Sequence, residues 1–210
     1  SNSVTPEALP TVIGQAYGGG FYAGQIGVSG VATHYLVVGP VSTAQSTLQC
    51  KNAATATPGS ESVIDGPQNT ADMVADGNST VYPAAHFCND LSTGGQTDWY
   101  MPAKNELDVC YFNLKPTTTA NNTGANAGGI NANAVPARTV IYTSGTPAQT
   151  SASAFITSSG AQAFSNGFYW SSTEYGVNST QYCQYFNTGQ LAKSSKNNSY
   201  YVRAIRRVVV

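Results

Sequence analysis

The stretch that decides the fold is the C-terminal one, GFYWSSTEYGVNSTQYCQYFNTGQLAKSSKNNSYYVRAIRRVVV (residues 167–210). Short runs rich in Tyr, Phe and Val are separated there by turns that contain Asn and Gly. This spacing is typical of an antiparallel meander of short strands. In STQYCQYF (179–186), alternation predicts one strand face that carries Tyr182 and Gln184 and another that carries Cys183 and Tyr185.

The N-terminal part of the chain predicts a second pair of strands. Three glycines (18–20) separate an arm or linker at residues 1–17 from a single domain at 18–210. Residues 21–28 and 31–40 are rich in β-forming residues on either side of a Gly-containing turn, which predicts a β-hairpin. The polar residues 41–66 that follow predict a long surface loop.

Three helices are predicted between the hairpin and the C-terminal stretch, over residues 69–75, 84–91 and 103–114. Asn69 or Thr70 would cap the first helix. The second and third each follow a proline, which favours the first turn of a helix.

The third predicted helix has apolar residues at three- and four-residue spacing, which is the pattern of an amphipathic helix. Lys104 and Asp108 would form a pair on its solvent-facing side. A low-complexity insertion follows at residues 115–152, within which residues 139–144 predict a short strand. Residues 153–164 predict a short helix or turn.

The composition is unusual for a free enzyme. Only 9% of the residues are charged, against about 25% in an average protein. The surface must therefore consist mainly of Ser, Thr, Asn, Gln and Gly, as is common in adhesins and virus-particle proteins. A net charge of −1 without a basic stripe argues against nucleic acid as a partner. The sequence contains no run of 18 apolar residues, so it predicts no membrane-spanning segment.

No motif predicts catalysis, a metal or a cofactor, and we expect a non-enzymatic protein. The four cysteines lack CxxC spacing, and we expect them to be buried apolar residues. One or two disulfides are the alternative if the protein matures in an oxidising compartment. His34 and His86 are isolated, which argues against zinc. A hydrolase remains the alternative, because carboxylates could pair in space for glycoside hydrolysis. The candidates are Asp98, Glu106, Asp108 and Glu174.

A recognition surface fits the C-terminal stretch better. Tyrosine provides contact area at low entropic cost, and Ser, Asn and Gly provide adaptable hydrogen bonds, as in antibody paratopes. Asn187 could equally be a turn former, and Tyr182 a core residue. The candidate ligand-binding residues are Tyr175, Asn178, Gln181, Tyr185, Asn187, Gln190, Asn197, Asn198 and Tyr200.

Two motifs carry a resemblance to a known family. DWYMPAKNEL (98–107) and YWSSTEY…YFNTG…VRAIRRV (169–208) resemble the C-terminal domain of the Legionella collagen-like adhesin. Similar domains occur in phage tail proteins and in the variable proteins of diversity-generating retroelements. The resemblance implies an α+β, C-type-lectin-like fold akin to that of formylglycine-generating enzymes. Two main helices would pack on a small twisted antiparallel sheet, with adjacent N- and C-terminal strands and long irregular loops.

The resemblance also implies structural roles for four residues. Trp99 and Trp170 would anchor the core. Arg203 and Arg206 would bind carboxylates or main-chain carbonyls near the sheet, with Asp98 and Glu174 as candidate partners.

Known chemistries of the wider group do not transfer to this chain. Formylglycine-generating enzymes use a pair of nearby C-terminal cysteines on copper, whereas Cys183 is the only cysteine in the C-terminal stretch 167–210. The Glu-Pro-Asn and Trp-Asn-Asp motifs of calcium-dependent lectins are missing from this sequence.

We therefore expect a domain that binds a host-surface protein or glycan, located in a virion tail or at the cell surface. The alternatives are a retroelement-diversified binding protein and a virion decoration module that assembles as a dimer or trimer.

Overall fold

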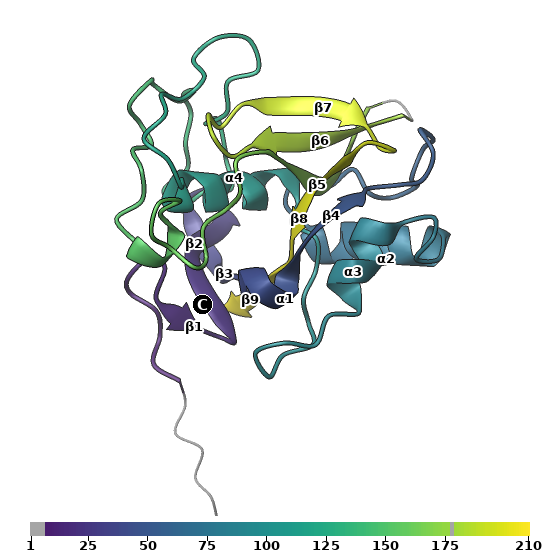
Figure 1. Cartoon of the computed structure of the whole chain (residues 1–210), viewed down its shortest axis with the longest axis horizontal. Helices are drawn as coiled ribbons and strands as arrows, with labels where there is room; N and C mark the ends of the chain where they lie inside the picture. The colour runs from purple at the N-terminus through teal and green to yellow at the C-terminus, as the bar shows by residue number, and fades with distance from the viewer. Residues whose placement is uncertain (1–6, 177–178) are drawn as a thin grey trace, which may run out of the picture.

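The computed structural model describes residues 7–176 and 179–210 and shows an α+β domain with two β-sheets (Figure 1). β2 (Gly20–Val28) and β3 (Val31–Val38) form the predicted hairpin, and β9 (Ile205–Val209) pairs antiparallel with β3. Strands from the two ends of the chain therefore lie side by side, as the resemblance implies. The first sheet contains, in spatial order, β1 (Ala16–Tyr17), β2, β3 and β9.

The second sheet holds most of the C-terminal stretch. β5 (Phe168–Tyr175), β6 (Thr180–Tyr185) and β7 (Leu191–Ser195) form the predicted antiparallel meander. β8 (Ser199–Arg203) does not continue it. It runs parallel to β5, where Tyr169 pairs with Tyr201, and antiparallel to β4 (Gln45–Gln49). The predicted meander is wrong for this strand, because the chain crosses the sheet after β7. The order is β4, β8, β5, β6 and β7.

One β-rich run, YYVRAIRRVVV (200–210), contributes a strand to each sheet. β8 ends and β9 begins on either side of Ala204, which is fully buried. The Ala204 N–H donates to the carbonyl of Ala44 (2.8 Å), and the Ala204 carbonyl accepts from the N–H of Gly39 (3.0 Å). Both polar groups of this residue are thereby satisfied away from the two ladders, so the chain can change sheets without burying an unpaired group.

The prediction of a long loop over residues 41–66 is wrong at its start. Helix α1 (Val41–Ala44) is followed directly by β4. Leu48 is the one large apolar residue of β4, so no apolar alternation marks the strand in the sequence. The strand forms because its backbone pairs with β8 along its whole length, from Gln45 opposite Arg203 to Gln49 opposite Ser199.

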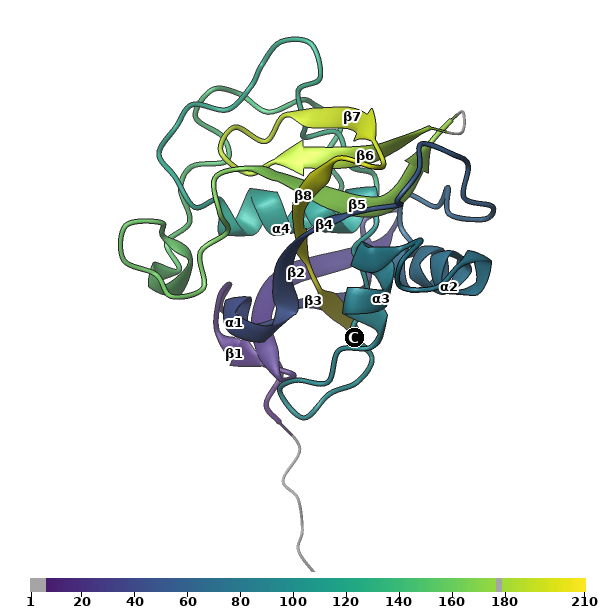
Figure 2. The same ribbon diagram turned by 45° about the vertical axis from the view of Figure 1, so that its right-hand side comes forward.

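The longer helices are α2 (Gly66–Asp76), α3 (Pro83–Asn89) and α4 (Lys104–Leu114). α2 and α3 lie together beside β4 and β5 (Figure 2). The cap of α2 is Asp65, whose carboxylate accepts from the N–H of Gln68 (3.3 Å), and not Asn69 or Thr70, which are buried within the helix. No helix in the described ranges is long and apolar enough to span a membrane.

α4 lies between the two sheets and contacts β2 on one side and β5 and β6 on the other (Figure 1). Because both sides are covered, its polar residues Asn105, Glu106 and Asp108 are buried too. Asp108 is 5% exposed, so the prediction that it forms a solvent-facing pair with Lys104 is wrong. Glu106 is fully buried and accepts from the Ala103 N–H (2.8 Å) and the Tyr100 hydroxyl (2.6 Å).

The insertion at 115–152 is irregular along its length and packs against α4 and the end of β6. Residues 139–144 are not a strand; isolated bridges such as Asn131–Arg138 and Thr143–Thr146 occur instead. The predicted short helix or turn at 153–164 is present as a 3-10 turn, Ser153–Phe155.

Both tryptophans are buried, as the resemblance implies. Trp170 is fully buried, and its indole N–H donates to the carbonyl of Leu48 (3.0 Å). Trp99 is 3% exposed and donates to the carbonyls of Thr93 and Gln96 (both 3.2 Å). Each large apolar side chain therefore fills the core without leaving its one polar group unpaired.

We predict that Trp170→Ala lowers the free energy of unfolding by about 3–5 kcal/mol, because it removes a large buried ring and leaves a cavity. Urea denaturation followed by circular dichroism measures the change. Val140→Ala, at a side chain that is 71% exposed, is the matched control and should change stability by less than about 0.5 kcal/mol. Equal stability of the Trp170→Ala and Val140→Ala variants would contradict the core assignment.

Candidate recognition surface

The candidate tyrosines of the C-terminal sheet lie on two different faces. The register of β5 with β6 places Phe168 opposite Tyr185 and Tyr175 opposite Thr180. Residues directly opposite each other share a face, and residues an odd number apart in a strand do not. Tyr175 and Tyr185 therefore point to opposite faces, and the expectation of one shared surface is wrong.

One face carries a row of aromatic rings that we call the aromatic ladder: Tyr185, Phe168, Tyr200 and Trp170. Successive ring centroids are 4.9, 5.2 and 4.7 Å apart. The first three rings are half-buried, whereas Trp170 is fully buried beneath Tyr200. The ladder thus presents partly exposed rings that rest on the core.

A groove runs beside the ladder. Leu48, which pairs with Tyr200 across β4 and β8, also lines a hollow of about 530 Å³ between β4 and α3. Phe87 and Leu91 give it apolar walls, and His86 lies among them. The His86 ring is held by a 2.7 Å hydrogen bond between Nε2 and the carbonyl of Gly77.

The opposite face carries a second group, which we call the lysine face: Tyr175, Tyr182, Lys193 and Lys104. The two tyrosine rings are 5.2 Å apart. The Lys193 ammonium lies 3.5 Å from the Tyr175 centroid, and the Lys104 ammonium lies 5.5 Å from that of Tyr182. Burial lowers the pKa of Lys104. In the described part of the chain, neither lysine forms an ion pair with a carboxylate.

The polar candidates differ in their availability. Gln181 is fully buried and donates to the carbonyl of Ser171 (3.0 Å), so its assignment as a surface contact is wrong. Asn187 is half-buried in a turn, and its amide oxygen accepts from Thr117 (3.0 Å). Asn178 lies outside the described residues.

Three further polar candidates are accessible. Asn197 and Asn198 are exposed in the turn between β7 and β8, and Gln190 is half-buried just before β7. Asn198 donates to the Ser194 hydroxyl (2.8 Å), which also lies 3.0 Å from the hydroxyl of Tyr200. The turn is thereby connected to the aromatic ladder.

The two arginines hold the frame, as the resemblance implies. Arg203 is 1% exposed and donates to the carbonyls of Gly39 (2.8 Å) and Gln162 (3.3 Å). Burial lowers the pKa of Arg203 to about 10, so its guanidinium stays charged at neutral pH.

Arg206 forms a two-pronged pair with Asp98, at 2.6 and 2.8 Å. Hydrogen bonding to Arg206 lowers the pKa of the Asp98 carboxyl. Glu174, the other partner considered for these arginines, instead pairs with the buried Lys196 at 3.0 Å.

Asp108 joins α4 to the insertion and to the second sheet, a role that sequence reasoning misses. Its carboxylate accepts from Arg138, from the Tyr142 hydroxyl (2.5 Å), from Asn131 (2.9 Å) and from Gln184 (3.2 Å). No local signal identifies these partners, because all four lie at least 23 residues away.

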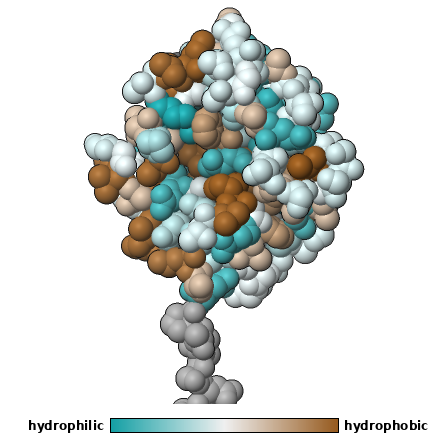
Figure 3. Space-filling view, turned by 90° about the vertical axis from the view of Figure 1, so that its left-hand side faces the viewer, coloured by the Kyte–Doolittle hydropathy of each residue, from teal (hydrophilic) through white to brown (hydrophobic). Residues whose placement is uncertain are grey.

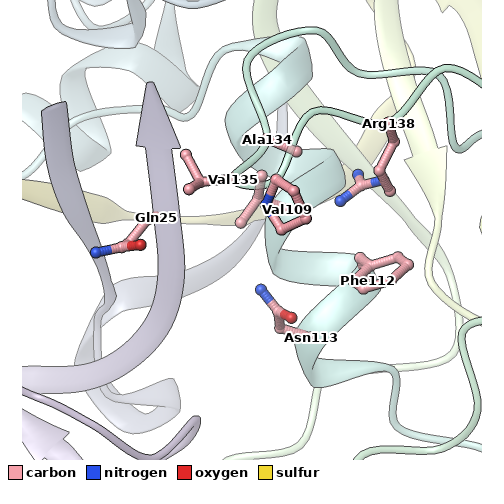
Figure 4. A pocket seen from close by; sticks show the side chains of 8 residues that line it. Gln25, Val109, Phe112, Asn113, Ala134, Val135 and Arg138 are labelled. Atoms are coloured by element: carbon pink, nitrogen blue, oxygen red, sulfur yellow. The ribbon is translucent and has the colours of Figure 1, made fainter. Parts of the chain in front are cut away.

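Two of the hollows that the insertion lines beside α4 meet at Arg138. The first, of about 70 Å³, lies between Gln25, Asn113 and Val135 (Figure 4). The Arg138 guanidinium, 4.3 Å from the Phe112 centroid, separates it from a second hollow of about 350 Å³ that Val140 lines. Hydrophobic side chains form separate patches on this side of the molecule (Figure 3). The first hollow is much smaller than an ordinary ligand pocket of about 300–1,000 Å³.

The cysteines show no sign of activation. All four are buried thiols without a disulfide. Burial raises the pKa of Cys50 and of Cys183 to about 12 and that of Cys88 and Cys110 further, so all four stay protonated. Within residues 7–176 and 179–210, no three His, Cys, Asp or Glu side chains gather in a way that could hold a metal ion.

The fold is of the α+β class, and its second sheet presents aromatic and polar side chains. The sequence model of the Lcl C-terminal domain family matches residues 46–206, most of the chain, and the protein belongs to this family. The family relates it to adhesin-type ligand-binding domains and to a surface or extracellular location. A search of curated proteins finds no match.

We predict that Asp108→Ala destabilises the domain by about 3–5 kcal/mol, because it leaves Arg138 without its buried partner. Hydrogen exchange should become faster at the amides of residues 127–142. Asp90→Ala, at an exposed carboxylate on the end of α3, is the control and should leave that exchange unchanged. Slow exchange in the Asp108→Ala variant would show that the insertion is held without this carboxylate.

Proposed function

We propose that this protein is a non-enzymatic recognition domain that binds a host-surface protein or glycan through its C-terminal sheet and the adjoining loops. The observation that carries the proposal is the aromatic ladder. Three half-buried rings lie in a row, with neighbouring ring centroids 4.9 and 5.2 Å apart. The row adjoins the groove that Leu48 lines. Flat rings of this kind can stack on a sugar or fit an apolar side chain.

Preorganisation supports binding at this surface. Tyr200 is held by its ring contact with Trp170 and by the Ser194 hydroxyl. Little side-chain entropy is therefore lost when a ligand covers it, and more of the contact energy appears as affinity. The same contacts give Tyr200 a structural role, so alanine at this position would uncover Trp170 as well as remove a binding group.

The side chains that could act in catalysis are engaged elsewhere. Glu106 lies against Tyr100 and Arg207, and Glu174 lies against Lys196. His34 contacts the Thr33 hydroxyl through Nδ1 (3.0 Å), and burial lowers the pKa of its ring. A hydrolase needs a nucleophile, a base and an orienting group in mutual contact, and these arrangements instead serve the frame.

The finer assignments belong to the same proposal. The adjacent N- and C-terminal strands and the helices beside the second sheet support a C-type-lectin-like architecture. An adhesin-type family and a weakly charged surface support a role in attachment, at a bacterial surface or in a phage tail.

The proposal predicts that Tyr185→Ala weakens ligand binding by about tenfold or more, the effect expected of an aromatic hot spot. The labelled domain would first be screened on arrays of glycans and of host-surface proteins, and the strongest ligand then titrated by calorimetry. Tyr185 touches Phe168 but not the core tryptophan, so the melting temperature should change little.

Two further variants sharpen this test. Tyr200→Phe keeps the ring over Trp170 and should retain most of the affinity for a ligand that stacks. Val140→Ala removes apolar surface on the insertion, away from the sheet, and serves as the control. Unchanged affinity of Tyr185→Ala would remove the ladder from the proposed site.

A further inference from the structure

β7 is the edge strand of the second sheet, and its register shows which backbone groups face outward. The Tyr185 N–H donates to Gln190 and the Lys196 N–H donates to Ser179, so both of these pairs are hydrogen-bonded. Hydrogen-bonded and non-hydrogen-bonded pairs alternate along an antiparallel ladder. Leu191, Lys193 and Ser195 therefore direct their N–H and C=O groups away from β6.

One of these outward groups already has a partner from outside the sheet. The Leu191 N–H donates to the carbonyl of Asn126 at 2.8 Å, so the insertion occupies the first position along the edge. The Ser195 carbonyl accepts from Asn198 in the following turn. Between them, the N–H and C=O of Lys193 have no hydrogen-bond partner among the described residues. The middle of β7 is an open edge of the kind that accepts another strand.

The side chain of Lys193 does not guard this edge. A lysine on an edge strand often prevents association by extending into solvent past the strand. Here the Lys193 ammonium lies 3.5 Å from the Tyr175 ring centroid, so the side chain lies back over the sheet. The backbone edge stays accessible, and the charge is placed on the lysine face beside it.

The charge around the edge is positive. Lys193 and Lys104 lie at the two ends of the Tyr175–Tyr182 pair. No Asp or Glu follows Glu174 in the sequence, and Glu174 is itself paired with Lys196. Asp108, which attracts Lys104, is bound to Arg138. An acidic side chain next to β7 would therefore meet two cations that lack a carboxylate in contact.

We propose that the edge of β7 binds an extended, acidic segment of a partner protein as an added β-strand. This inference rests on the proposed function and names its ligand class as protein rather than glycan. Strand addition obtains affinity from main-chain hydrogen bonds and specificity from alternate side chains. The guest residue opposite Lys193 would exchange both backbone hydrogen bonds with it, and an Asp or Glu there would face the Lys193 ammonium.

The backbone separates this ligand from an acidic glycan. A glycan can approach the two ammonium groups, but it lacks the regularly spaced N–H and C=O groups that match the outward groups of β7. Loss of the Lys193 N–H should therefore weaken the binding of a peptide. The binding of an acidic oligosaccharide should depend on the lysine charge alone.

The test uses the full domain and a synthetic peptide, acetyl-Thr-Val-Thr-Glu-Thr-Val-Thr-amide, with a Lys-for-Glu peptide as its control. We expect saturable binding of the Glu peptide with a Kd below about 1 mM. The Lys193 amide should become protected from hydrogen exchange, and the Lys-for-Glu peptide should bind at least about tenfold more weakly. An oligogalacturonate serves as the acidic-glycan probe.

Lys193→Pro removes the outward N–H without touching the ladder to β6, a position where an edge strand tolerates proline. This substitution should weaken binding of the Glu peptide at least about tenfold. The loss of affinity should exceed that of Lys193→Ala, which removes the charge but keeps the N–H. If Lys193→Pro lowers the melting temperature, Lys193→Glu replaces it in the test, because it keeps the N–H. The Lys193→Glu variant must bind the Lys-for-Glu peptide more tightly than the Glu peptide.

Absence of peptide binding, equal binding by Lys193→Pro and wild type, or Lys193-dependent binding of the oligogalacturonate alone would each overturn the strand-addition proposal. The strongest ligand found on the glycan and protein arrays distinguishes failure of the strand-addition proposal from failure of the proposed function. If Tyr185→Ala loses that ligand and Lys193→Pro retains it, recognition through the sheet stands and the edge proposal fails. If neither variant loses it, both fail.

Discussion

The arrangement of the two sheets depends on the hydrogen bonds that the buried guanidinium of Arg203 donates. It lies at the end of β8, one residue before the chain passes into β9, and it binds the carbonyls of Gly39 and Gln162. Gly39 follows β3 of the first sheet, and Gln162 precedes β5 of the second. A charge taken out of water is tolerated only when it is fully hydrogen-bonded. The position of Arg203 therefore fixes the point at which the sheets meet.

α4 shows what this junction requires of the rest of the chain. With a sheet on either side, the helix leaves only Lys104, Phe112 and Asn113 half-buried, and its buried carboxylates need internal partners. Glu106 finds them in Tyr100 and Arg207, and Asp108 finds them in the insertion. The low-complexity segment is thus a structural cover for a buried helix, and its irregular backbone follows the positions of these polar groups.

Sequence patterns reveal the parts of this fold that rest on local chemistry. The hairpin at Ser29, the helix after Pro102 and the strand alternation around Tyr182 follow from turn residues and periodicity. β4, the parallel course of β8 and the burial of Asp108 do not, because each depends on residues more than twenty positions away. The same limit applies to the candidate site: tyrosine content predicts an aromatic surface, but only the register separates Tyr175 from Tyr185.

Several of the donors that hold the frame end on main-chain carbonyls. Trp99, Trp170 and Arg203 all do so, at Thr93, Leu48 and Gly39 among others. A carbonyl oxygen is present whatever side chain its residue carries. At these points the frame places no demand on the side chain of the residue that accepts, so the amino acids there can change while the hydrogen bonds remain. Evolutionary freedom at these positions is thereby a consequence of where these hydrogen bonds end.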